Sequence, residues 1–509
     1  MKAKISAQLN ARKRRIEKRL DPANGPIGDQ PVFTASNIHY EFAERTRGIA
    51  HGGIGVVQAL AREIGLIDAI NERLHVLKLH LPYHESDHVL NFAYNALCEG
   101  SCLQDIELRR NDEVFLDALG ACRIPDPTTA GDFCRRFTPA HIDALEEAFH
   151  DVRTKVWAKQ PEAFFEQATI DMDGTLVETT GECKQGMDIA YDGTWGYHAL
   201  VLTLANTGEV LSVVNRSGNR PSHEGAAARV DKCLDVCFRG GFRNVLLRGD
   251  TDFSQTEHLD RWNADPRVKF VFGYDARPNL VDIAKSLPEQ AWEQLKRPPR
   301  YTVKTQRRTK RERVKEQVVV AREFENKRLY GEEVAEFDYR PTACSQTYRM
   351  VVVCKNISKQ KGEQALFDEF EYRFYITNDR VMKKHEVVLA ANGRCHQENI
   401  LAQLLGGVRA LTAPVDNLVS NWAYMVMTAL AWNLKAWWAL WLPEPPGRWQ
   451  EKYSAEKLWL LGLEFKTFVQ TFVRLPCQIV RTGRRIVYRL LSWNPYLRAF
   501  FRLTEVLRC

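Results

Sequence analysis

Residues 168–177 constrain the fold of this chain more than any other stretch. Their alternation predicts a β-strand, in which successive side chains point to opposite faces, so Ile170 points one way and Asp171 and Asp173 point the other. Gly174 is expected to break the strand immediately afterwards. The pattern therefore predicts a buried strand with one or two carboxylates at its exposed end, where they could hold a magnesium ion.

The segments that follow this strand predict an ordered series of elements. In chain order we expect strands at 197–204 and 210–214 joined by a hairpin turn at 206–208, a helix from Ser222 to Gly240, a strand at 244–248, a short helix at 254–262 and a strand at 269–273. That order is the order of a ribonuclease H-like core, in which the first and fourth strands lie side by side. Asp173 and Asp250, at the ends of those two strands, are then expected to meet at the carboxyl edge of the sheet.

The rest of the chain predicts a helical region before this core and an insertion within it. Apolar residues recur at helical spacing from Gly52 to about Gln160, whereas residues 300–378, including Val318 to Val320, alternate like strands. From Lys384 a helical pattern is expected to continue with few breaks to the end. We therefore expect an α/β protein divided into a basic N-terminal arm (1–48), a helical domain (49–160), the first part of the core (161–278), a β-rich insertion (279–372), and the second part of the core with a helical basic C-terminal region (373–509).

Three strongly basic segments are attached to an otherwise acidic body in this 509-residue chain of net charge +7. Residues 2–19, 296–315 and 481–509 together hold 25 Lys and Arg against three acidic residues. This distribution favours a polyanion such as nucleic acid as the partner over three unrelated solvated charge runs.

The sequence favours a cytoplasmic protein. No apolar run follows the basic start, so no signal peptide is expected. The most apolar window, residues 425–442, contains Asn433 and Lys435 and fits a buried helix better than a membrane span. The twelve cysteines show no zinc-binding spacing and are expected to be reduced thiols.

A third acidic residue is needed if Asp173 and Asp250 serve phosphodiester chemistry. Two close carboxylates are best kept ionised by a divalent cation, and a second cation needs a third carboxylate. Glu398 is the candidate, because it follows Arg394 by one turn of a predicted helix, and Arg394 could contact a DNA phosphate. Spacing alone favours an ordinary Arg394–Glu398 pair on a solvated helix over a metal ligand.

Several segments resemble the bacterial insertion-sequence transposases that carry a group 1 DDE domain. They are Asp-Met-Asp-Gly-Thr-Leu-Val-Glu-Thr at 171–179, Arg-Ser-Gly-Asn at 216–219, Leu-Leu-Arg-Gly-Asp-Thr-Asp-Phe at 246–253, Phe-Tyr-Ile-Thr-Asn at 374–378, Arg-x-x-x-Glu-Asn-x-Ile at 394–400, and Asn-Trp to Asn-Leu at 421–434. The resemblance spans about residues 50–490 in the right order. Two positions depart from it: related transposases often have Tyr three residues before the Arg and Lys seven after the Glu, where this chain has Ala391 and Leu405.

The resemblance implies a DNA transposase that cleaves phosphodiester bonds at transposon ends and transfers the 3′-hydroxyl into target DNA. Asp173, Asp250 and Glu398 would be its catalytic and metal-binding triad, with Asp171 as the rival for the first place. Two Mg²⁺ ions, replaceable by Mn²⁺, would be the cofactors. The partners would be double-stranded DNA, at terminal inverted repeats and target sites, and further copies of the chain in a homodimer or larger assembly. The setting would be the nucleoid-associated cytoplasm of a bacterium, away from any membrane.

The same resemblance implies how DNA is held. The helical domain and the basic arm would recognise the inverted repeats, and the insertion would clamp DNA through its phosphates. The expected DNA-binding residues are Arg12, Arg14, Arg15, Arg300, Lys304, Arg307, Arg308, Lys310, Arg311 and Arg394.

Two alternatives accompany this interpretation. A haloacid-dehalogenase-type phosphatase would use Asp171 as nucleophile and Asp173 as general acid/base. That fold needs a helix where this chain predicts a hairpin, and Asp250 and Asp252 have the wrong spacing for its late acidic motif. A non-catalytic DNA-binding protein derived from a transposase is the other alternative, and nothing in the sequence favours loss of the triad.

Overall fold

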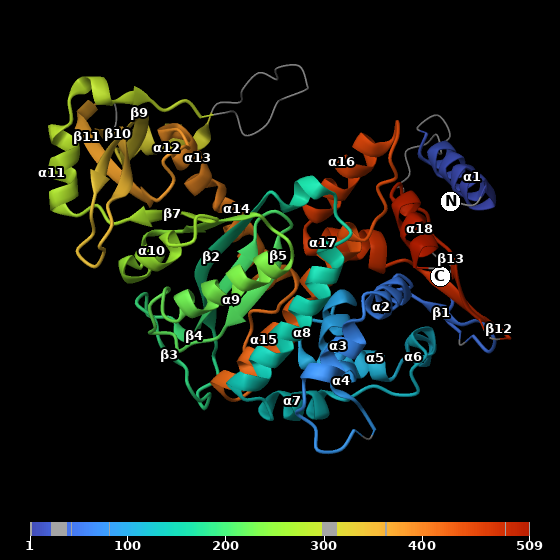
Figure 1. Cartoon of the computed structure of the whole chain (residues 1–509). Coiled ribbons are helices and arrows are strands. Elements are labelled where there is room, and N and C mark those ends of the chain that lie inside the picture. The colour runs from blue at the N-terminus through green and yellow to red at the C-terminus, as the bar shows by residue number, and fades with distance from the viewer. Residues whose placement is uncertain are drawn as a thin grey trace.

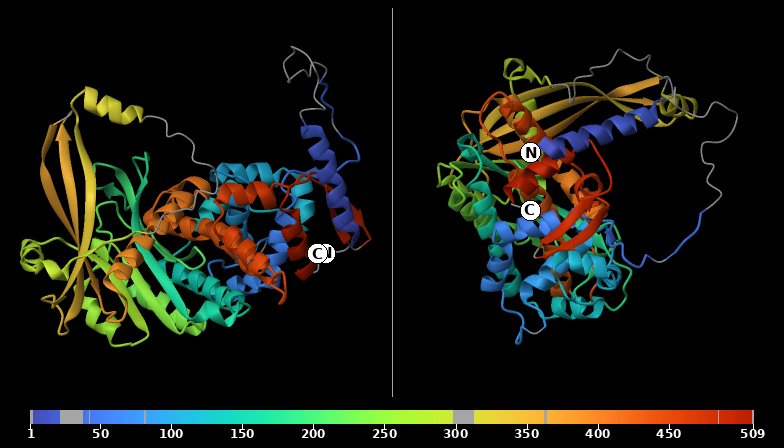
Figure 2. Two further views of the ribbon diagram at one scale, coloured as in Figure 1. Left: turned by 90° about the horizontal axis from the view of Figure 1, so that it is seen from above. Right: turned by 90° about the vertical axis from the view of Figure 1, so that its right-hand side faces the viewer.

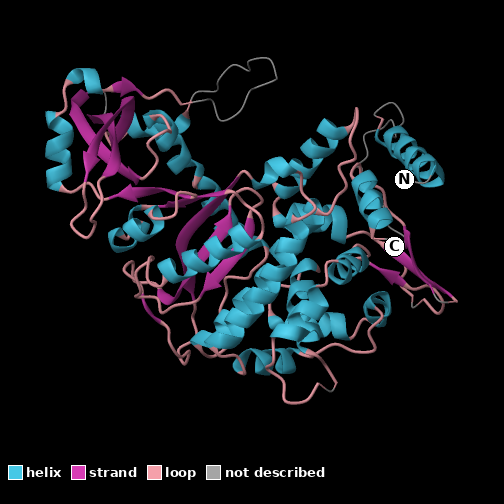
Figure 3. Ribbon diagram, viewed as in Figure 1, coloured by secondary structure: helices cyan, strands magenta, loops and turns pink. Residues whose placement is uncertain are grey.

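The computed structural model describes residues 3–21, 38–41, 43–80, 82–297, 313–361, 364–483 and 485–507. A mixed sheet crosses the molecule, most of the helices gather beside one half of it, and long antiparallel strands extend from the other half (Figure 1; Figure 3). The protein is thus a mixed α/β protein.

Helices precede the sheet, as the sequence predicts. They are α2 (Ile54–Glu63), α3 (Leu66–Arg73), α4 (Glu85–Leu97), α5 (Ile106–Arg110), α6 (Glu113–Leu119), α7 (Pro127–Arg135) and α8 (Pro139–Trp157). Their ends carry ordinary start signals: the Asp126 side chain accepts from the backbone N–H of Thr129 at the start of α7, and Pro127 occupies its first turn. The Asp126-Pro127 pair thus marks the start of α7.

The sheet combines parallel and antiparallel pairs. Its strands are β2 (Gln167–Glu178), β3 (Asp188–Ile189), β4 (Trp195–Leu204), β5 (Glu209–Val214), β6 (Asn244–Gly249), β7 (Val268–Tyr274), β8 (Glu293–Gln294), β9 (Glu325–Tyr339), β10 (Tyr348–Lys361) and β11 (Gln364–Thr377). Their order is β3-β4-β2-β6-β7-β11-β10-β9-β8, and β5 also pairs with β4. The pairs β2–β6 and β6–β7 are parallel. The first and fourth strands of the predicted series, β2 and β6, therefore do lie side by side.

Gly174 does not end β2, contrary to the sequence-based expectation. The strand continues to Glu178, paired with β4 as far as Gly196. Only the parallel pairing with β6 stops early, at Asp171 and Arg248. The missing side chain of Gly174 instead makes room for a neighbour, because a Cβ there would lie 2.7 Å from Nε2 of His198.

Two helices accompany this half of the sheet, and a turn precedes the first of them. They are α9 (Ala226–Arg239) and α10 (Thr256–Asn263). The expected start of α9 at Ser222 is wrong, because the helix begins after Gly225, which adopts a left-handed φ of 73°. Nη1 of Arg216 binds the carbonyl oxygens of Pro221, Ser222 and Glu224, so these carbonyls serve a turn instead of a helix.

The region between β7 and β11 is rich in strands, as expected, with one exception. Residues 318–320 lie in helix α12 (Val314–Ala321), which follows α11 (Pro278–Ser286) in the chain. Three consecutive valines have no polar residues between them, so the alternation that marks a strand is absent, and the flanking Lys, Glu, Gln and Ala favour a helix. β11 pairs with both β10 and β7 and so joins this region to the core sheet.

The chain after β11 is helical up to residue 473, but it does not stay helical to the end. The helices are α13 (Lys384–Gly393), α14 (Cys395–Ala402), α15 (Leu418–Leu440), α16 (Gln450–Leu461), α17 (Phe465–Phe468) and α18 (Leu497–Val506). Between α17 and α18 lies a hairpin of β12 (Cys477–Thr482) and β13 (Arg485–Leu490). β12 also pairs with β1 (Gly48–Ile49), so the hairpin is part of a three-stranded sheet.

The two chain ends lie together (Figure 2). Residues 3–20, which the sequence assigned to a basic N-terminal arm, form helix α1 (Ala3–Leu20). Its inner face turns Leu9 into the core, and Nη1 of Arg12 donates to the carbonyl of Ser492 at 3.0 Å. From the other side, Arg498 of α18 donates to Oδ1 of Asn10 at 2.9 Å.

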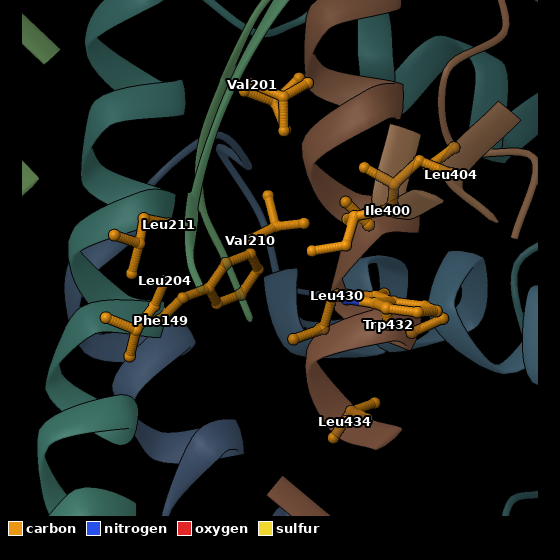
Figure 4. Close-up of a cluster of buried hydrophobic side chains, with 14 of the residues drawn as sticks. Phe149, Val201, Leu204, Val210, Leu211, Ile400, Leu404, Leu430, Trp432 and Leu434 are labelled. Carbon is orange, nitrogen blue, oxygen red and sulfur yellow. The ribbon is translucent and has the colours of Figure 1, made fainter. Parts of the chain in front are cut away.

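The core lies on both faces of the β4–β5 half of the sheet (Figure 4). On one face Leu211 meets Phe149 of α8, and on the other Val210 meets α14 and α15. Helix α15, the most apolar segment of the chain, is almost wholly buried, as the sequence predicts. None of the helices in the described ranges has the length and apolar character needed to span a membrane.

Candidate active site

The first aspartate of the Asp-Met-Asp motif, Asp171, forms an ion pair inside the sheet, and the second, Asp173, is not part of that pair. Asp171 and Arg248 are the last residues paired between the parallel strands β2 and β6. Nε and Nη2 of Arg248 donate to the two oxygens of Asp171 at 2.7 and 2.8 Å, and Asp171 is only 1% exposed. Both oxygens of Asp171 are thus engaged by one guanidinium in a bidentate ion pair.

Arg394 brings together the next two carboxylates. Asp173 and Asp250 lie two residues beyond Asp171 and Arg248, so strand alternation directs them to the same face. Nη1 of Arg394 donates to Oδ2 of Asp173 at 2.7 Å, and its Nη2 lies 3.9 Å from Oδ2 of Asp250. The expected meeting of Asp173 and Asp250 is therefore seen, with a guanidinium between them.

Burial makes these two carboxylates hard to ionise. It raises the pKa of Asp173 to about 6, against the opposing effect of Arg394 and with a further rise from Asp250. It also raises the pKa of Asp250, whose charged form Arg394 again favours. Asp250 caps the short helical turn Thr251–Phe253 by accepting from the backbone N–H of Asp252 at 3.1 Å, which fixes its orientation. The site thus needs a cation close by, and Arg394 supplies one in this structure.

Glu398 lies on α14, one turn after Arg394, which joins α13 to α14; we call these two helices the helix pair. Glu398 is exposed in the first turn of α14, and no ion pair joins it to Arg394 among the described residues, although its charge favours the guanidinium. The ordinary Arg394–Glu398 pair that spacing allows is thus replaced by pairs from Arg394 to the aspartates. α14 is held on the sheet by the buried Gln397, which donates to the carbonyl of Val201 at 3.0 Å.

The carboxylate oxygens of this site suit a divalent cation of the magnesium type. That ion takes oxygen ligands from one or two carboxylates and keeps several waters, and Asp173 and Asp250 supply such a pair. A closed three-ligand site is not assembled: within the described parts of the chain, no group of three or more His, Cys, Asp and Glu is arranged to hold a metal.

Arg248 is the residue of this site that the sequence interpretation missed. A signal was present, because Arg248 precedes Asp250 by the same two residues by which Asp171 precedes Asp173. On neighbouring parallel strands equal offsets mean neighbouring positions on one face. His198, which packs under Gly174 and pairs through Nδ1 with the carbonyl of Arg220 at 2.8 Å, was also missed, and no sequence signal marked it.

The expected DNA-binding residues fall into three groups. Arg394 faces carboxylates. Arg14 and Arg15 are exposed on α1, whereas Arg12 is partly buried against Ser492. The remaining six, Arg300, Lys304, Arg307, Arg308, Lys310 and Arg311, lie outside the described residues.

The fold and the site together define an α/β protein with an acidic site just beyond the point where the parallel pairing of β2 with β6 ends. A family model described as the transposase DDE domain, group 1, matches residues 37–509. The chain therefore belongs to this family of DDE transposases. Among solved structures it is similar to the piggyBac transposase in a cryo-EM structure of its synaptic complex with hairpin DNA, with 11% identity and a TM-score of 0.34 over 84% of this chain and 82% of that one. No curated protein matches the chain.

Proposed function

We propose that this protein is the DNA transposase of a bacterial insertion sequence, with a ribonuclease H-like catalytic core. The observation that carries the proposal is that Asp173 and Asp250, from neighbouring parallel strands, share one guanidinium on the helix pair that bears Glu398. The parallel pairing of β2 with β6 supports the assignment of the core, because the sequence predicts that the first and fourth strands of a ribonuclease H-like sheet lie side by side.

In this proposal Asp173, Asp250 and Glu398 hold two Mg²⁺ ions, for which Mn²⁺ can substitute. Such ions stabilise the attacking and leaving oxygens of a phosphodiester when they are bound. Asp173 and Asp250 gain most from them, because burial disfavours the ionised forms of both side chains. Arg394, relieved of its carboxylate partners, then has a fork of donors that fits a DNA phosphate.

The reaction is cleavage at each transposon end followed by attack of the released 3′-hydroxyl on target DNA. The helical region at 49–160 recognises the inverted repeats, and a dimer or larger assembly holds two ends together. The basic segment that includes Arg300, Lys304 and Arg307 contacts phosphates without reading bases.

A further DNA surface is proposed where the chain ends meet. We call α1, α18 and the sheet β1–β12–β13 the terminal module (Figure 2). Arg14 and Arg15 of α1 and Arg485 and Arg489 of the hairpin are exposed on it. Two basic segments that are separate in the sequence thus belong to one module, which supports a role in holding DNA phosphates.

The test of the catalytic proposal is nicking of a supercoiled plasmid with Mg²⁺ or Mn²⁺. Asp173→Asn, Asp250→Asn and Glu398→Gln should each lower the nicking rate by about 100-fold or more, because each removes a charge that stabilises the reacting phosphate through the bound cation. Binding of a fluorescent DNA duplex should be unchanged in all three.

Glu257→Gln, an exposed carboxylate of α10, is the control for changing an acidic residue and should nick like the wild type. Normal nicking by Glu398→Gln would refute the two-ion assignment. Duplex binding by the wild type with no nicking under either metal would instead identify a non-catalytic DNA-binding protein.

A further inference from the structure

The ion pair of Asp171 and Arg248 has no part in the proposed chemistry, yet Arg248 reaches beyond it. Nε and Nη2 of Arg248 bind Asp171, and Nη1 donates to the carbonyl oxygen of Ala390 at 2.9 Å. Ala390 lies in the last turn of α13. One guanidinium therefore joins β2, β6 and the C-terminal end of α13.

The fit between Arg248 and α13 is close. A Cβ at Gly393 would overlap Nη1 of Arg248, so a side chain at residue 393 would force the guanidinium or the helix to shift. Gly393 is the last residue of α13, and Arg394 follows it directly before α14 begins at Cys395. The contact thus lies within a few residues of Arg394.

Apolar packing holds α13 on the sheet along its length. Val387 and Val388, in the first half of the helix, belong to one apolar cluster with Leu246 and Val271 of the sheet, and Ala391, in its last turn, packs against the same cluster. Arg248 adds a directional polar contact at this end of the helix. A buried ion pair contributes little net stability compared with apolar side chains of the same volume, whereas its planar, bidentate geometry fixes orientation.

We infer that Arg248 is a positioning residue for the junction of α13 and α14, and that Asp171 holds its guanidinium in place. Through its contacts with Ala390 and Gly393, Arg248 fixes the distance between this junction and the strands β2 and β6. Arg394 then reaches Asp173 and Asp250, and Glu398 follows on the next turn. We call the contacts of Arg248 with Asp171, Ala390 and Gly393 the anchor. The inference rests on the proposed function only for its consequence in catalysis, because the anchor itself is a matter of geometry.

Two variants test the anchor from opposite sides. Arg248→Lys keeps a positive charge for Asp171 but cannot bind both Asp171 oxygens and Ala390 at once. Gly393→Ala leaves Arg248 and Asp171 unchanged and places a methyl group against Nη1. Gly406→Ala is the matched control, because a Cβ at that position meets nothing within 4 Å.

The first measurement is hydrogen exchange of the full chain by mass spectrometry. Residues 384–402 should exchange faster in both variants, while peptides from β2 and β6 keep the wild-type rate. Unchanged exchange at 384–402 would overturn the anchor. Faster exchange of β2 and β6 as well would also overturn it, because Arg248 would then simply hold the sheet together.

The second measurement is plasmid nicking with Mg²⁺ as a function of DNA concentration. Both variants should lose about 10- to 100-fold in kcat, as is usual when the support of a site residue is removed, with KM unchanged. Wild-type kcat in both variants would refute a positioning role. If the wild type itself does not nick, the proposed function fails and takes the catalytic consequence with it, whereas the exchange result still decides the anchor.

Discussion

At the residue scale, the same side-chain type has different roles two positions apart. Asp171 lies inside the parallel pairing of β2 with β6, where a buried arginine engages both of its oxygens. Asp173 lies just past the end of that pairing, and its side chain is 15% exposed. The chain belongs to a DDE transposase family, which argues against the phosphatase alternative, and Arg248 pairs with both oxygens of the supposed nucleophile Asp171.

Lys435 provides a prediction on stability at this scale. It lies in the buried helix α15, where Nζ donates to the carbonyl of Leu461 at 2.9 Å and sits 3.8 Å from the ring centroid of Trp432. Burial lowers the pKa of Lys435 from 10.5 to about 7. The folded state thus binds this proton more weakly than the unfolded state, which destabilises the fold at pH values where lysine is charged in both states.

We expect the stability of the wild type to rise, relative to Lys435→Met, as pH increases from about 7 to about 10, by a few kcal/mol at most. The cost of burying the charge disappears as Lys435 loses its proton in the folded state. Urea unfolding of both proteins across this range measures the difference. Lys466→Met, at an exposed position of α17, is the control for altering a lysine, and a difference that stays flat with pH for Lys435→Met would contradict the prediction.

At the element scale, the secondary structure of short segments depends more on the pattern of their residues and on their pairing than on their composition. The hairpin of β12 and β13 exists beside β1, which lies more than 400 residues earlier in the chain. Its alternation on both sides of Gly483 was a readable strand signal inside a segment assigned to helix. Residues 318–320 show the opposite case, because β-branched residues alone, without alternation, do not make a strand.

The terminal module yields a prediction on DNA binding. The pair Arg14→Gln and Arg15→Gln, and separately the pair Arg485→Gln and Arg489→Gln, should each reduce the slope of log affinity against log salt by up to about 2, since each removes up to two phosphate contacts. Fluorescence anisotropy with a DNA duplex at several salt concentrations measures this slope.

Arg243→Gln with Arg267→Gln is the matched control, because these exposed arginines precede β6 and β7 at the end of the sheet away from the acidic site. This pair removes the same two charges and should leave the slope near the wild-type value. If all three pairs change the slope equally, the module is a solvated surface and contributes only net charge.

At the scale of the whole molecule, one buried carboxylate connects the helical region, the sheet and the late helices. Oε1 of Glu209, at the start of β5, accepts from Arg153 of α8 at 3.1 Å and from Trp437 of α15 at 2.8 Å. Its Oε2 accepts from Trp157 at 2.9 Å and from Thr207 at 2.7 Å. Arg153 and Glu209 are 1% and 0% exposed, so neither can exchange its partner for water.

Glu209→Gln should therefore lower the free energy of unfolding by about 3 kcal/mol or more, because it leaves Arg153 buried without a counter-charge. Urea unfolding followed by tryptophan fluorescence measures the loss. Glu147→Gln is the control: it removes a partner of Arg239 on the exposed side of α8 and should cost less than about 1 kcal/mol. Equal losses in the two variants would show that the Glu209 cluster has no special role in joining the three regions.

Much of this protein is determined by local sequence. Apolar patterning with a two-residue period or a short buried run marked β2, β4, β5, β6 and β7, and the spacing of apolar residues marked α15 as a buried helix. The order of these elements indicated that β2 and β6 are neighbours. From that order alone the sequence placed Asp173 and Asp250 at one edge of the sheet, because parallel strands end on the same side.

Tertiary structure decided what alternation could not. Asp171 and Asp173 have the same parity along β2, so the sequence directs both to one face and cannot rank them. The strand register decides: the pairing of β2 with β6 ends at Asp171 and Arg248, so Asp173 pairs instead with Arg394, which comes from a helix junction more than 200 residues later in the chain. Such a junction is positioned by packing between distant segments, and that information is carried by no single stretch of the sequence.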